Sequence, residues 1–271
     1  MKIGLALGGG AARGIAHIGV LKYLEDRGVV PCCVAGTSAG SIVGSLYCSG
    51  KTPDELIKIA KSISWKDLVK ITIPKKGLIN SSLILDIVSE YLGEIDFKDL
   101  KIPLKVNAVD LLSGDEIVIT EGSVAESVQA SCAIPGIFTP VKKDKYFFVD
   151  GGLLDNVPVT TMLDEDLDYI IAVDVGSQKP FEKEPSSIFE ILMQSFDIVR
   201  RHRDIPAHKH ADVMIAPDLG DISLWDVTKT DILVNKGYKE AEEKLSGVDL
   251  GKKQGKFQKW LRNRKKNKKE Q

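Results

Sequence analysis

The chain has 271 residues, of which 43% are hydrophobic, and a formal net charge of −1. The charge is uneven, because residues 252–271 carry ten Lys or Arg and one Glu, a net of +9, which leaves −10 on residues 1–251. Four cysteines without CxxC pairs and only four histidines argue against a disulfide framework and a structural zinc site. The acidic body also makes nucleic acid a poor candidate partner.

The chain shows no signal-peptide pattern and no apolar stretch long enough to span a bilayer. We therefore expect an intracellular, cytoplasmic protein. Strand and helix patterns alternate along the chain, which favours one α/β domain over residues 1–250 followed by a basic tail at 251–271.

The first third of the chain predicts strands that lead into loops and helices. In order, these are a strand at 2–7, a flexible glycine loop at 8–14, a helix at 15–27, a buried strand through Cys32 and Cys33, and a turn at Ser38. Thr52 is the expected N-cap of another helix, with Pro53 in its first position. Residues 64–80 are irregular, and two interpretations remain open, a cap over a site or a packed connection.

The remaining elements follow from hydrophobic periodicity and turn residues. In order, they are a helix at 81–92, a hairpin of strands 104–111 and 116–120, a helix at 121–132, strands at 146–149 and 169–175, a helix at 187–202, a strand at 212–216 and a helix at 231–245.

A Gly-x-Ser-x-Gly motif, GTSAG at 36–40, lies where an apolar run gives way to a helix-compatible run. This is the context of a nucleophile elbow, in which the serine occupies a strained turn. Gly36 and Gly40 lack a Cβ, so strand and helix can pack closely beneath Ser38, and the amides of the helix N-terminus favour developing negative charge. The motif alone is equally typical of an ordinary Gly/Ser-rich turn.

The glycine loop at 8–14, GGGAARG, is not a nucleotide fingerprint, because Arg13 stands where the third glycine of G-x-G-x-x-G belongs. It also lacks the Gly-Lys-Ser/Thr of a P-loop. A triple glycine beside a cation that opens a helix can instead hold an oxyanion. The alternative is a tight strand–helix turn, although three glycines cost such a turn backbone entropy.

A base for Ser38 must come from elsewhere in the chain. A Ser…Asp…His order requires His202, His208 or His210, and none of them follows a predicted strand. We expect His202 on an exposed helix and the other two in a polar loop. His17, on the first helix, is more typical of a packed or solvated side chain than of a catalytic one.

Asp150 is the better candidate, because it ends a predicted strand and is followed by Gly151 and Gly152, which allow close approach. The loops at 8–14, Ser38 and Asp150 all follow strands, so we expect them to meet at the carboxyl edge of the sheet. A carboxylate in hydrogen-bond reach can accept the serine proton, and burial would raise its pKa from about 4. Asp-Gly-Gly alone is a common turn.

Four segments, in order, resemble the patatin-like phospholipase family: GGGAARG at 8–14, GTSAG at 36–40, ASCAIP at 130–135 and DGG at 150–152. Each is weak alone, but the ordered set is specific and spans a little over half of the chain. The resemblance implies a three-layer α/β/α fold with a mostly parallel central sheet, of the compact microbial type. It implies a structural role for 130–135 and requires no metal or cofactor.

The resemblance also implies residue roles: a dyad with Ser38 as nucleophile and Asp150 as base, and an oxyanion hole lined by Gly9, Gly10 and Arg13. The expected activity is hydrolysis of acyl esters of lipids by a phospholipase, lysophospholipase or esterase reaction. Two alternatives remain open. One is an acyltransferase or thioesterase on the same scaffold, and the other is a regulatory protein with little turnover.

The basic tail carries Phe257, Trp260 and Leu261 on one helical face. A basic amphipathic segment at 252–269 can lie on an anionic membrane, which suits an enzyme that acts on lipids. A solvated, disordered tail is the alternative.

Overall fold

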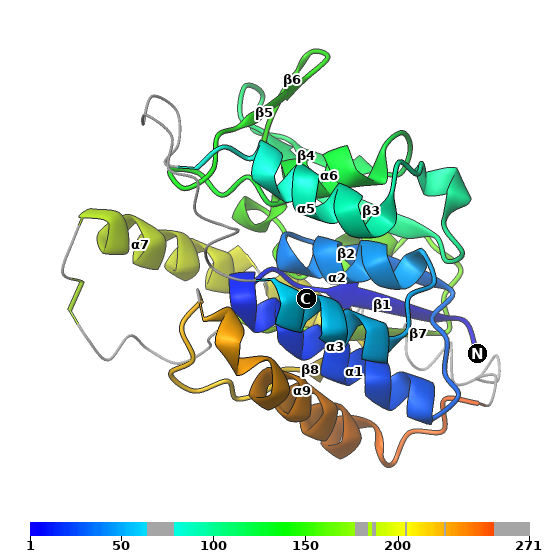
Figure 1. Ribbon diagram of the computed structural model, residues 1–271. Helices are drawn as coiled ribbons and strands as arrows, with labels where there is room; N and C mark the ends of the chain where they lie inside the picture. The colour runs from blue at the N-terminus through cyan, green and yellow to red at the C-terminus, as the bar shows by residue number, and fades with distance from the viewer. Residues whose placement is uncertain (64–78, 177–183, 186–187, 204, 225, 252–271) are drawn as a thin grey trace.

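A computed structural model describes residues 1–63, 79–176, 184–185, 188–203, 205–224 and 226–251. Eight strands in these residues form one sheet (Figure 1). They are β1 (Ile3–Leu7), β2 (Cys33–Gly36), β3 (Leu104–Asp110), β4 (Glu116–Ile119), β5 (Val141–Lys143), β6 (Tyr146–Asp150), β7 (Tyr169–Val173) and β8 (Val213–Ile215). The expected cap at 64–80, apart from its last two residues, and the basic tail lie outside the described residues.

Strand direction divides the sheet into two parts. The order across it is β5-β6-β3-β2-β1-β7-β8, and β4 also pairs with β3. The strands from β3 through β2, β1 and β7 to β8 are parallel neighbours. The pairs β3–β4, β3–β6 and β5–β6 are antiparallel. The prediction of a mostly parallel central sheet is therefore confirmed.

Helices follow most of the strands. They are α1 (Ala16–Asp26), α2 (Ala39–Cys48), α3 (Pro53–Ser62), α5 (Ser82–Leu92), α6 (Val124–Ser131), α7 (Ile188–Arg203), α8 (Ile205–His210) and α9 (Thr230–Leu245). Short 3-10 helices are η1 (Ala11–Ile15), η2 (Phe97–Asp99), η3 (Gly151–Leu153), η4 (Thr160–Met162) and η5 (Val227–Lys229). None of the helices in the described ranges combines the length and the apolar character that crossing a membrane requires.

Alternating side chains of β1 divide the core between the two faces of the sheet. Leu5 and Leu7 join the larger hydrophobic cluster with residues of α1, α2 and α9. Ala6 joins a smaller cluster with η4 and with Ala207 of α8. Figure 1 shows α1, α2, α3 and α9 together on one side of the sheet. The central sheet thus has flanking helices, as the sequence predicts.

Helices α1 and α9 cross with their backbones in contact. A Cβ on Gly19 would lie 1.9 Å from the carbonyl oxygen of Val234, and one on Gly237 would lie 2.0 Å from that of Ala16. Only glycine permits this approach at either position, because a Cβ would overlap backbone atoms. The crossing therefore packs α1, which follows the glycine loop, directly against α9.

Several local predictions can be compared with the elements. Thr52 caps α3 in a capping box with Glu55, with Pro53 in the first turn, as predicted. The sequence predicts a flexible loop at 8–14, whereas the structure shows that its second half, from Ala11, forms the 3-10 helix η1. The prediction of a polar loop at His208 and His210 is wrong, because these residues belong to α8.

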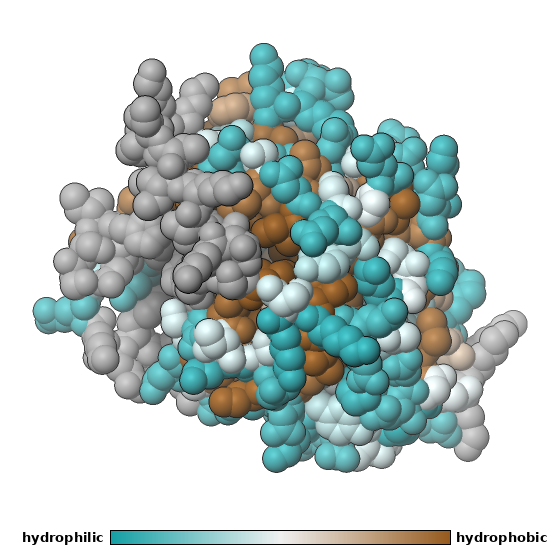
Figure 2. Space-filling model, viewed as in Figure 1, coloured by the Kyte–Doolittle hydropathy of each residue, from teal (hydrophilic) through white to brown (hydrophobic). Residues whose placement is uncertain are grey.

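Two further differences concern strands. Cys32 is exposed and precedes β2, whereas Cys33 is buried within it, so only one of the two thiols lies in the buried strand. The short strand β5 was not predicted, because its three residues pair only with β6 and carry little apolar alternation. On the face drawn in Figure 2, hydrophilic residues cover most of the rim and hydrophobic ones gather near the centre, around α2, α3 and α5.

Candidate active site

Ser38 occupies a sharp elbow between β2 and α2. Its backbone has φ 49° and ψ −122°, a conformation that non-glycine residues rarely adopt and that marks local strain. A Cβ on Gly40 would lie 2.0 Å from the carbonyl oxygen of Leu7, and one on Gly36 would lie 2.7 Å from that of Gly40. The two glycines of the motif therefore let α2 pack against the ends of β1 and β2, as the sequence predicts for an elbow.

The segment at 130–135 holds this elbow from the side. The amide of Ser38 donates a hydrogen bond to the hydroxyl oxygen of Ser131, at 2.9 Å. Cys132 is buried, and its thiol lies 3.9 Å from the hydroxyl of Ser41 in the first turn of α2. Burial and the nearby Asp150 raise the pKa of the Cys132 thiol. The segment thus provides a polar contact to the Ser38 backbone and a neutral thiol beneath it.

Asp150 ends β6, but this strand is not one of the parallel strands whose carboxyl ends were expected to place it. Strand β6 is antiparallel to β3, so its carboxyl end does not belong to the carboxyl edge of the parallel strands. Asp150 nevertheless pairs with Ala108, while Gly36 at the end of β2 pairs with Val106 of the same strand. The side chain reaches the level of Ser38 because β6 pairs only with the carboxyl-terminal part of β3.

The carboxyl group of Asp150 is buried and partly hydrogen-bonded. The residue is 6% exposed, as is Ser38. The amide of Gly152 donates to its Oδ1 at 2.8 Å. Burial raises the pKa of Asp150 to about 6, against the opposing effect of hydrogen bonds from the Gly152 amide and the Ser38 side chain. This carboxyl is therefore a stronger base than an exposed aspartate and remains mostly ionised at neutral pH.

The glycine loop passes beside Ser38. A Cβ on Gly9 would lie 3.1 Å from the Cβ of Ser38 and 2.6 Å from the amide oxygen of Asn156. The amide of Gly9 already donates to the carbonyl of Asn156, at 3.0 Å. The Gly10 carbonyl accepts from the amide of Arg13, at 3.1 Å. Among the hydrogen bonds of the described residues, none uses the amide of Gly10, so this amide keeps its donor capacity for another group.

Arg13 turns its side chain toward a distant loop. Its Nε donates to the carbonyl of Ile222 at 2.8 Å, and its Nη2 lies 3.3 Å from the carbonyl of Gly220. Burial lowers the pKa of Arg13. The guanidinium thereby joins η1 to the segment before η5.

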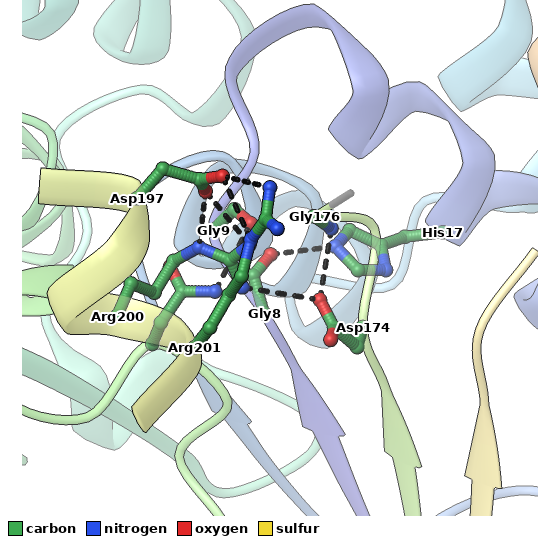
Figure 3. Close-up of polar contacts among 9 residues, drawn as sticks. Gly8, Gly9, His17, Asp174, Gly176, Asp197, Arg200 and Arg201 are labelled. Atoms are coloured by element: carbon green, nitrogen blue, oxygen red, sulfur yellow. Dashed lines mark hydrogen bonds and ion pairs between the residues drawn. The ribbon is translucent and has the colours of Figure 1, made fainter. Parts of the chain in front are cut away.

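His17 is fully buried beneath the glycine loop. Its Nε2 donates to the carbonyl of Gly8 at 2.7 Å (Figure 3), and its Nδ1 has no hydrogen-bond partner among the described residues. Burial lowers the pKa of His17 to about 4, so the ring is neutral at pH 7. His202 is exposed on α7 and His210 lies at the end of α8. The ring nitrogens of His17 are therefore not arranged as a base for Ser38.

A second polar group lies where α7 meets the end of β7. Asp174 is fully buried, and its Oδ1 accepts from the amide of Gly176 at 2.8 Å and lies 3.6 Å from Nη1 of Arg200. Arg200 and Arg201 also bind Asp197 one turn earlier in α7, at 2.8 and 2.7 Å. Figure 3 shows this charged group beside Gly8 and the glycine loop. The contact between Arg200 and Asp174 joins α7 to the end of β7, whereas the ion pairs with Asp197 lie within the helix.

Sequence reasoning missed the polar residues that join the loops. Thr37 directs its hydroxyl to Oδ1 of Asn107 at 2.7 Å and to the carbonyl of Asp155 at 3.0 Å. Asn107 in turn donates from Nδ2 to that same carbonyl, at 2.8 Å. A Cβ on Gly151 would lie 2.5 Å from the carbonyl oxygen of Asn107. A buried amide in a strand was the available signal, but its partners lie 48 and 70 residues away.

The fold and this site define an α/β protein with a serine at a strand–helix elbow and a buried carboxyl group beside it. Residues 5–163, more than half of the chain, match the family model described as patatin-like phospholipase, and the chain therefore belongs to that family. The resemblance stated from the sequence motifs is thereby confirmed.

Individual relatives carry the NTE family description. An uncharacterized NTE family protein of Mycobacterium tuberculosis is 34% identical over 181 residues, which cover 66% of this chain and 50% of that protein. The neuropathy target esterase sws of Drosophila melanogaster is 33% identical over 65% of this chain and 13% of its own length. Lysophospholipase NTE1 of Meyerozyma guilliermondii is 31% identical over 82% of this chain and 15% of its own length. The chain thus spans half or less of these relatives.

Among solved structures, the crystal structure of VipD from Legionella pneumophila aligns with a TM-score of 0.59. The alignment covers 89% of this chain and 66% of VipD, at 16% sequence identity. At this identity the likeness concerns the fold alone, and it agrees with the mixed, mostly parallel sheet described above.

Proposed function

We propose that this chain is a serine lipid acyl hydrolase in which Ser38 is the nucleophile and Asp150 the general base. The observation that carries the proposal is the pairing of a serine in a strained elbow with a buried aspartate whose pKa is raised to about 6. A base works best when its pKa lies near the operating pH, and a serine needs an adjacent base because its hydroxyl is otherwise a weak nucleophile.

In the first half of the reaction, Asp150 takes the proton from the Ser38 hydroxyl as its Oγ forms a bond to the ester carbonyl carbon. The carbonyl electrons move to the oxygen, which becomes the oxyanion. When the oxyanion collapses, the bond between the carbon and the alcohol oxygen breaks, and Asp150 returns the proton to the alcohol. The product is an acyl group on Ser38 and a released alcohol.

In the second half, water enters and gives a proton to Asp150 as its oxygen bonds to the acyl carbon. Collapse of this second oxyanion breaks the bond to the Ser38 Oγ, which recovers the proton from Asp150. The released product is the fatty acid. Each proton that Asp150 accepts is therefore returned within the same half-reaction, and this chain's residues supply every proton-transfer step.

The oxyanion is assigned to the amides of the glycine loop. Gly10 is the donor best supported, since its amide has no acceptor within the described part of the chain. The amide of Gly9 is occupied by Asn156, so Gly9 contributes mainly by its lack of a side chain beside Ser38. Arg13 contributes its positive charge and fixes η1 through Ile222. Hydrogen-bond donors whose orientation is already fixed by the fold need not reorient when the oxyanion forms.

A lipid ester is the substrate class that the relatives favour. The family description is patatin-like phospholipase, and one relative is named a lysophospholipase and another an esterase. We therefore assign the chain to carboxylic ester hydrolysis on lipids.

The test is hydrolysis of a p-nitrophenyl ester and of a lysophospholipid by matched variants. Ser38→Ala is expected to lower kcat by at least about 10⁴-fold, and Asp150→Asn by about 10²–10⁴-fold. Ser246→Ala and Asp164→Asn change exposed residues of the same types and serve as controls. Full activity of the Ser38→Ala protein would refute the proposal.

A serine-reactive fluorophosphonate separates an enzyme from a protein that keeps the fold with little turnover. The probe should label the wild-type chain and the Ser246→Ala control, and it should fail to label Ser38→Ala. Absence of labelling in the wild-type chain would instead favour the regulatory alternative.

Contact of the basic tail with a membrane remains a sequence-based hypothesis. It is tested by deleting residues 252–271 and measuring sedimentation with anionic liposomes. Reduced sedimentation of the shortened chain is expected, and equal sedimentation would remove the hypothesis.

A further inference from the structure

Asn156 lies between the glycine loop and the turn that follows Asp150. It is 4% exposed and belongs to the segment between η3 and η4. Its carbonyl oxygen accepts from the amide of Gly9 at 3.0 Å, and its Nδ2 lies 3.4 Å from the carbonyl oxygen of Gly9, to which it donates. One residue thus binds both the N–H and the C=O of Gly9, although 147 positions separate the two in the sequence.

The side-chain oxygen of Asn156 fills the space left by two glycines. A Cβ would lie 2.6 Å from this oxygen if placed on Gly9, and 2.9 Å from it if placed on Gly152. The same Cβ on Gly152 would lie 3.1 Å from Oδ1 of Asp150. The amide of Asn156 therefore packs directly against both loops, on one side beside the Ser38 elbow and on the other beside the proposed base.

The hydrogen bonds fix two successive peptide groups. The peptide between Gly8 and Gly9 is held at its oxygen by Nε2 of His17 and at its nitrogen by the carbonyl of Asn156. The peptide between Gly9 and Gly10 is held at its oxygen by Nδ2 of Asn156. Because a trans peptide directs its N–H opposite to its C=O, the Gly10 amide points away from Asn156.

We propose that Asn156 is a positioning residue that orients the Gly10 amide as the oxyanion donor. By contacting both the glycine loop and the turn after Asp150, it also fixes the position of this amide relative to Asp150. This inference rests on the proposed function, since it concerns the oxyanion of the same acyl transfer. Without the Nδ2 contact the Gly9–Gly10 peptide is free to rotate, because glycine has the least restricted backbone of all residues. A donor that must be reoriented during the reaction loses much of its stabilising effect on the oxyanion.

The proposal predicts a specific kinetic pattern for Asn156→Ala. The kcat for a p-nitrophenyl ester should fall by roughly 10-fold or more, up to the about 10²–10³-fold that loss of an oxyanion donor costs, while KM changes little. Affinity for a trifluoromethyl ketone, which forms a tetrahedral oxyanion on a serine, should fall by a similar factor. The pH midpoint of kcat/KM should stay close to that of the wild type, because Asp150 keeps its hydrogen bonds from the Gly152 amide and the Ser38 side chain.

Asn156→Asp gives a second, isosteric test. It replaces the Nδ2 donor by an oxygen that repels the Gly9 carbonyl, so kcat should fall at least as far as in Asn156→Ala. The added carboxylate lies near Asp150, and like charges raise a carboxyl pKa, so the pH midpoint should move upward. Asn235→Ala, on the exposed face of α9, is the matched control and should behave as the wild type.

The outcomes separate the inference from the proposed function. If Ser38→Ala retains activity in the same assays, the proposed function fails whatever Asn156 does. If Ser38→Ala is inactive but folded Asn156→Ala matches Asn235→Ala in kcat and in ketone affinity, the role of Asn156 is overturned. A lower melting temperature with unchanged kcat and ketone affinity also overturns it, as a purely structural contact. Should Asn156→Ala not fold, the same comparison on Asn156→Asp decides.

Discussion

The parallel and antiparallel parts of the sheet contribute to the site in different ways. Ser38 and the glycine loop follow the parallel strands β2 and β1, whose carboxyl ends lie together at one edge. Asp150 comes from β6, which runs in the opposite direction and reaches the same level only through its pairing with Ala108. Local turn geometry thus sets the proposed nucleophile, whereas the pairing of distant strands sets the proposed base.

Burial shifts the pKa of one titratable group in each part of the sheet, in opposite directions. On the parallel side, burial of His17 lowers its pKa and favours the neutral ring. On the antiparallel side, burial of Asp150 raises its pKa and likewise favours the neutral acid. His17 therefore lowers the free energy of unfolding in acid solution, where the unfolded chain binds a proton that the folded chain does not. Asp150 lowers it at high pH, where the unfolded chain has lost a proton that the folded chain tends to keep. Substitutions and pH changes can therefore affect the parallel part and the antiparallel part of the sheet separately.

The largest effect is expected from Gly40→Ala, which breaks the parallel side. The new Cβ would lie 2.0 Å from the Leu7 carbonyl, a backbone atom that cannot move aside, so α2 must shift. We expect loss of esterase activity and a decrease of about 3 kcal/mol or more in the free energy of unfolding, measured by urea denaturation.

Gly44→Ala is the matched control, one turn further along α2. There the nearest atoms, 3.3 and 3.4 Å away, belong to the side chains of Val34 and Leu104. Alanine is also the better helix former by about 1 kcal/mol, so stability should change by no more than about 1 kcal/mol. Equal losses in Gly40→Ala and Gly44→Ala would contradict the close approach at the elbow.

The next effect concerns His17 in acid. Its pKa of about 4 in the folded state lies below the ordinary 6.5, so the unfolded chain binds a proton that the folded chain does not. The stability present above pH 6.5 is therefore lost as the pH falls toward 4, by about 3 kcal/mol for a shift of this size. His17→Gln keeps a donor for Gly8 and should remove this loss. Parallel acid unfolding curves for both proteins would contradict it.

A somewhat smaller effect of opposite sign is expected at Asp150. Its folded-state pKa of about 6 exceeds the ordinary 3.8, so its contribution to stability is complete below pH 3.8 and is lost as the pH rises through 6. Asp150→Asn should therefore raise the free energy of unfolding at pH 8 by about 2–3 kcal/mol while lowering kcat by about 10²–10⁴-fold. Thermal melting at pH 5 and pH 8 checks the sign, and a variant destabilised at pH 8 would contradict it.

The pH profile of catalysis is the mildest test of the antiparallel side. The proposed base must be ionised, so kcat/KM should fall as the pH drops through about 6, roughly tenfold per unit below that value. A midpoint near 4 would indicate that burial does not perturb Asp150, and a midpoint near 7 that persists in Asp150→Asn would indicate another group.

Sequence reasoning predicted most elements, and the physical reasons can be given. Thr52 and Pro53 predict the start of α3 because capping depends on four neighbouring residues. The elbow at Ser38 follows from glycines two positions away on either side. The three loops lie close together, as expected. The argument from the carboxyl ends of parallel strands holds only for the loops after β1 and β2, because the residues of β6 do not reveal its direction in the sheet.

By itself, the sequence determined the local features, which are the strained serine, the glycine loop and the helix caps, because each depends on residues close together in the chain. It also indicated the family, through short motifs that are each local and that occur in a fixed order. Only the tertiary structure decided that β6 is antiparallel, that Asn107 ties Thr37 to the segment after Asp150, and that Asn156 holds Gly9. The hydrogen bonds that Asn107 and Asn156 make to these groups join positions 48 to 147 residues apart. The physical reason is that a buried side-chain amide must form hydrogen bonds, and the fold determines which polar groups lie within reach. The residues next to the amide in the sequence do not indicate which groups these are.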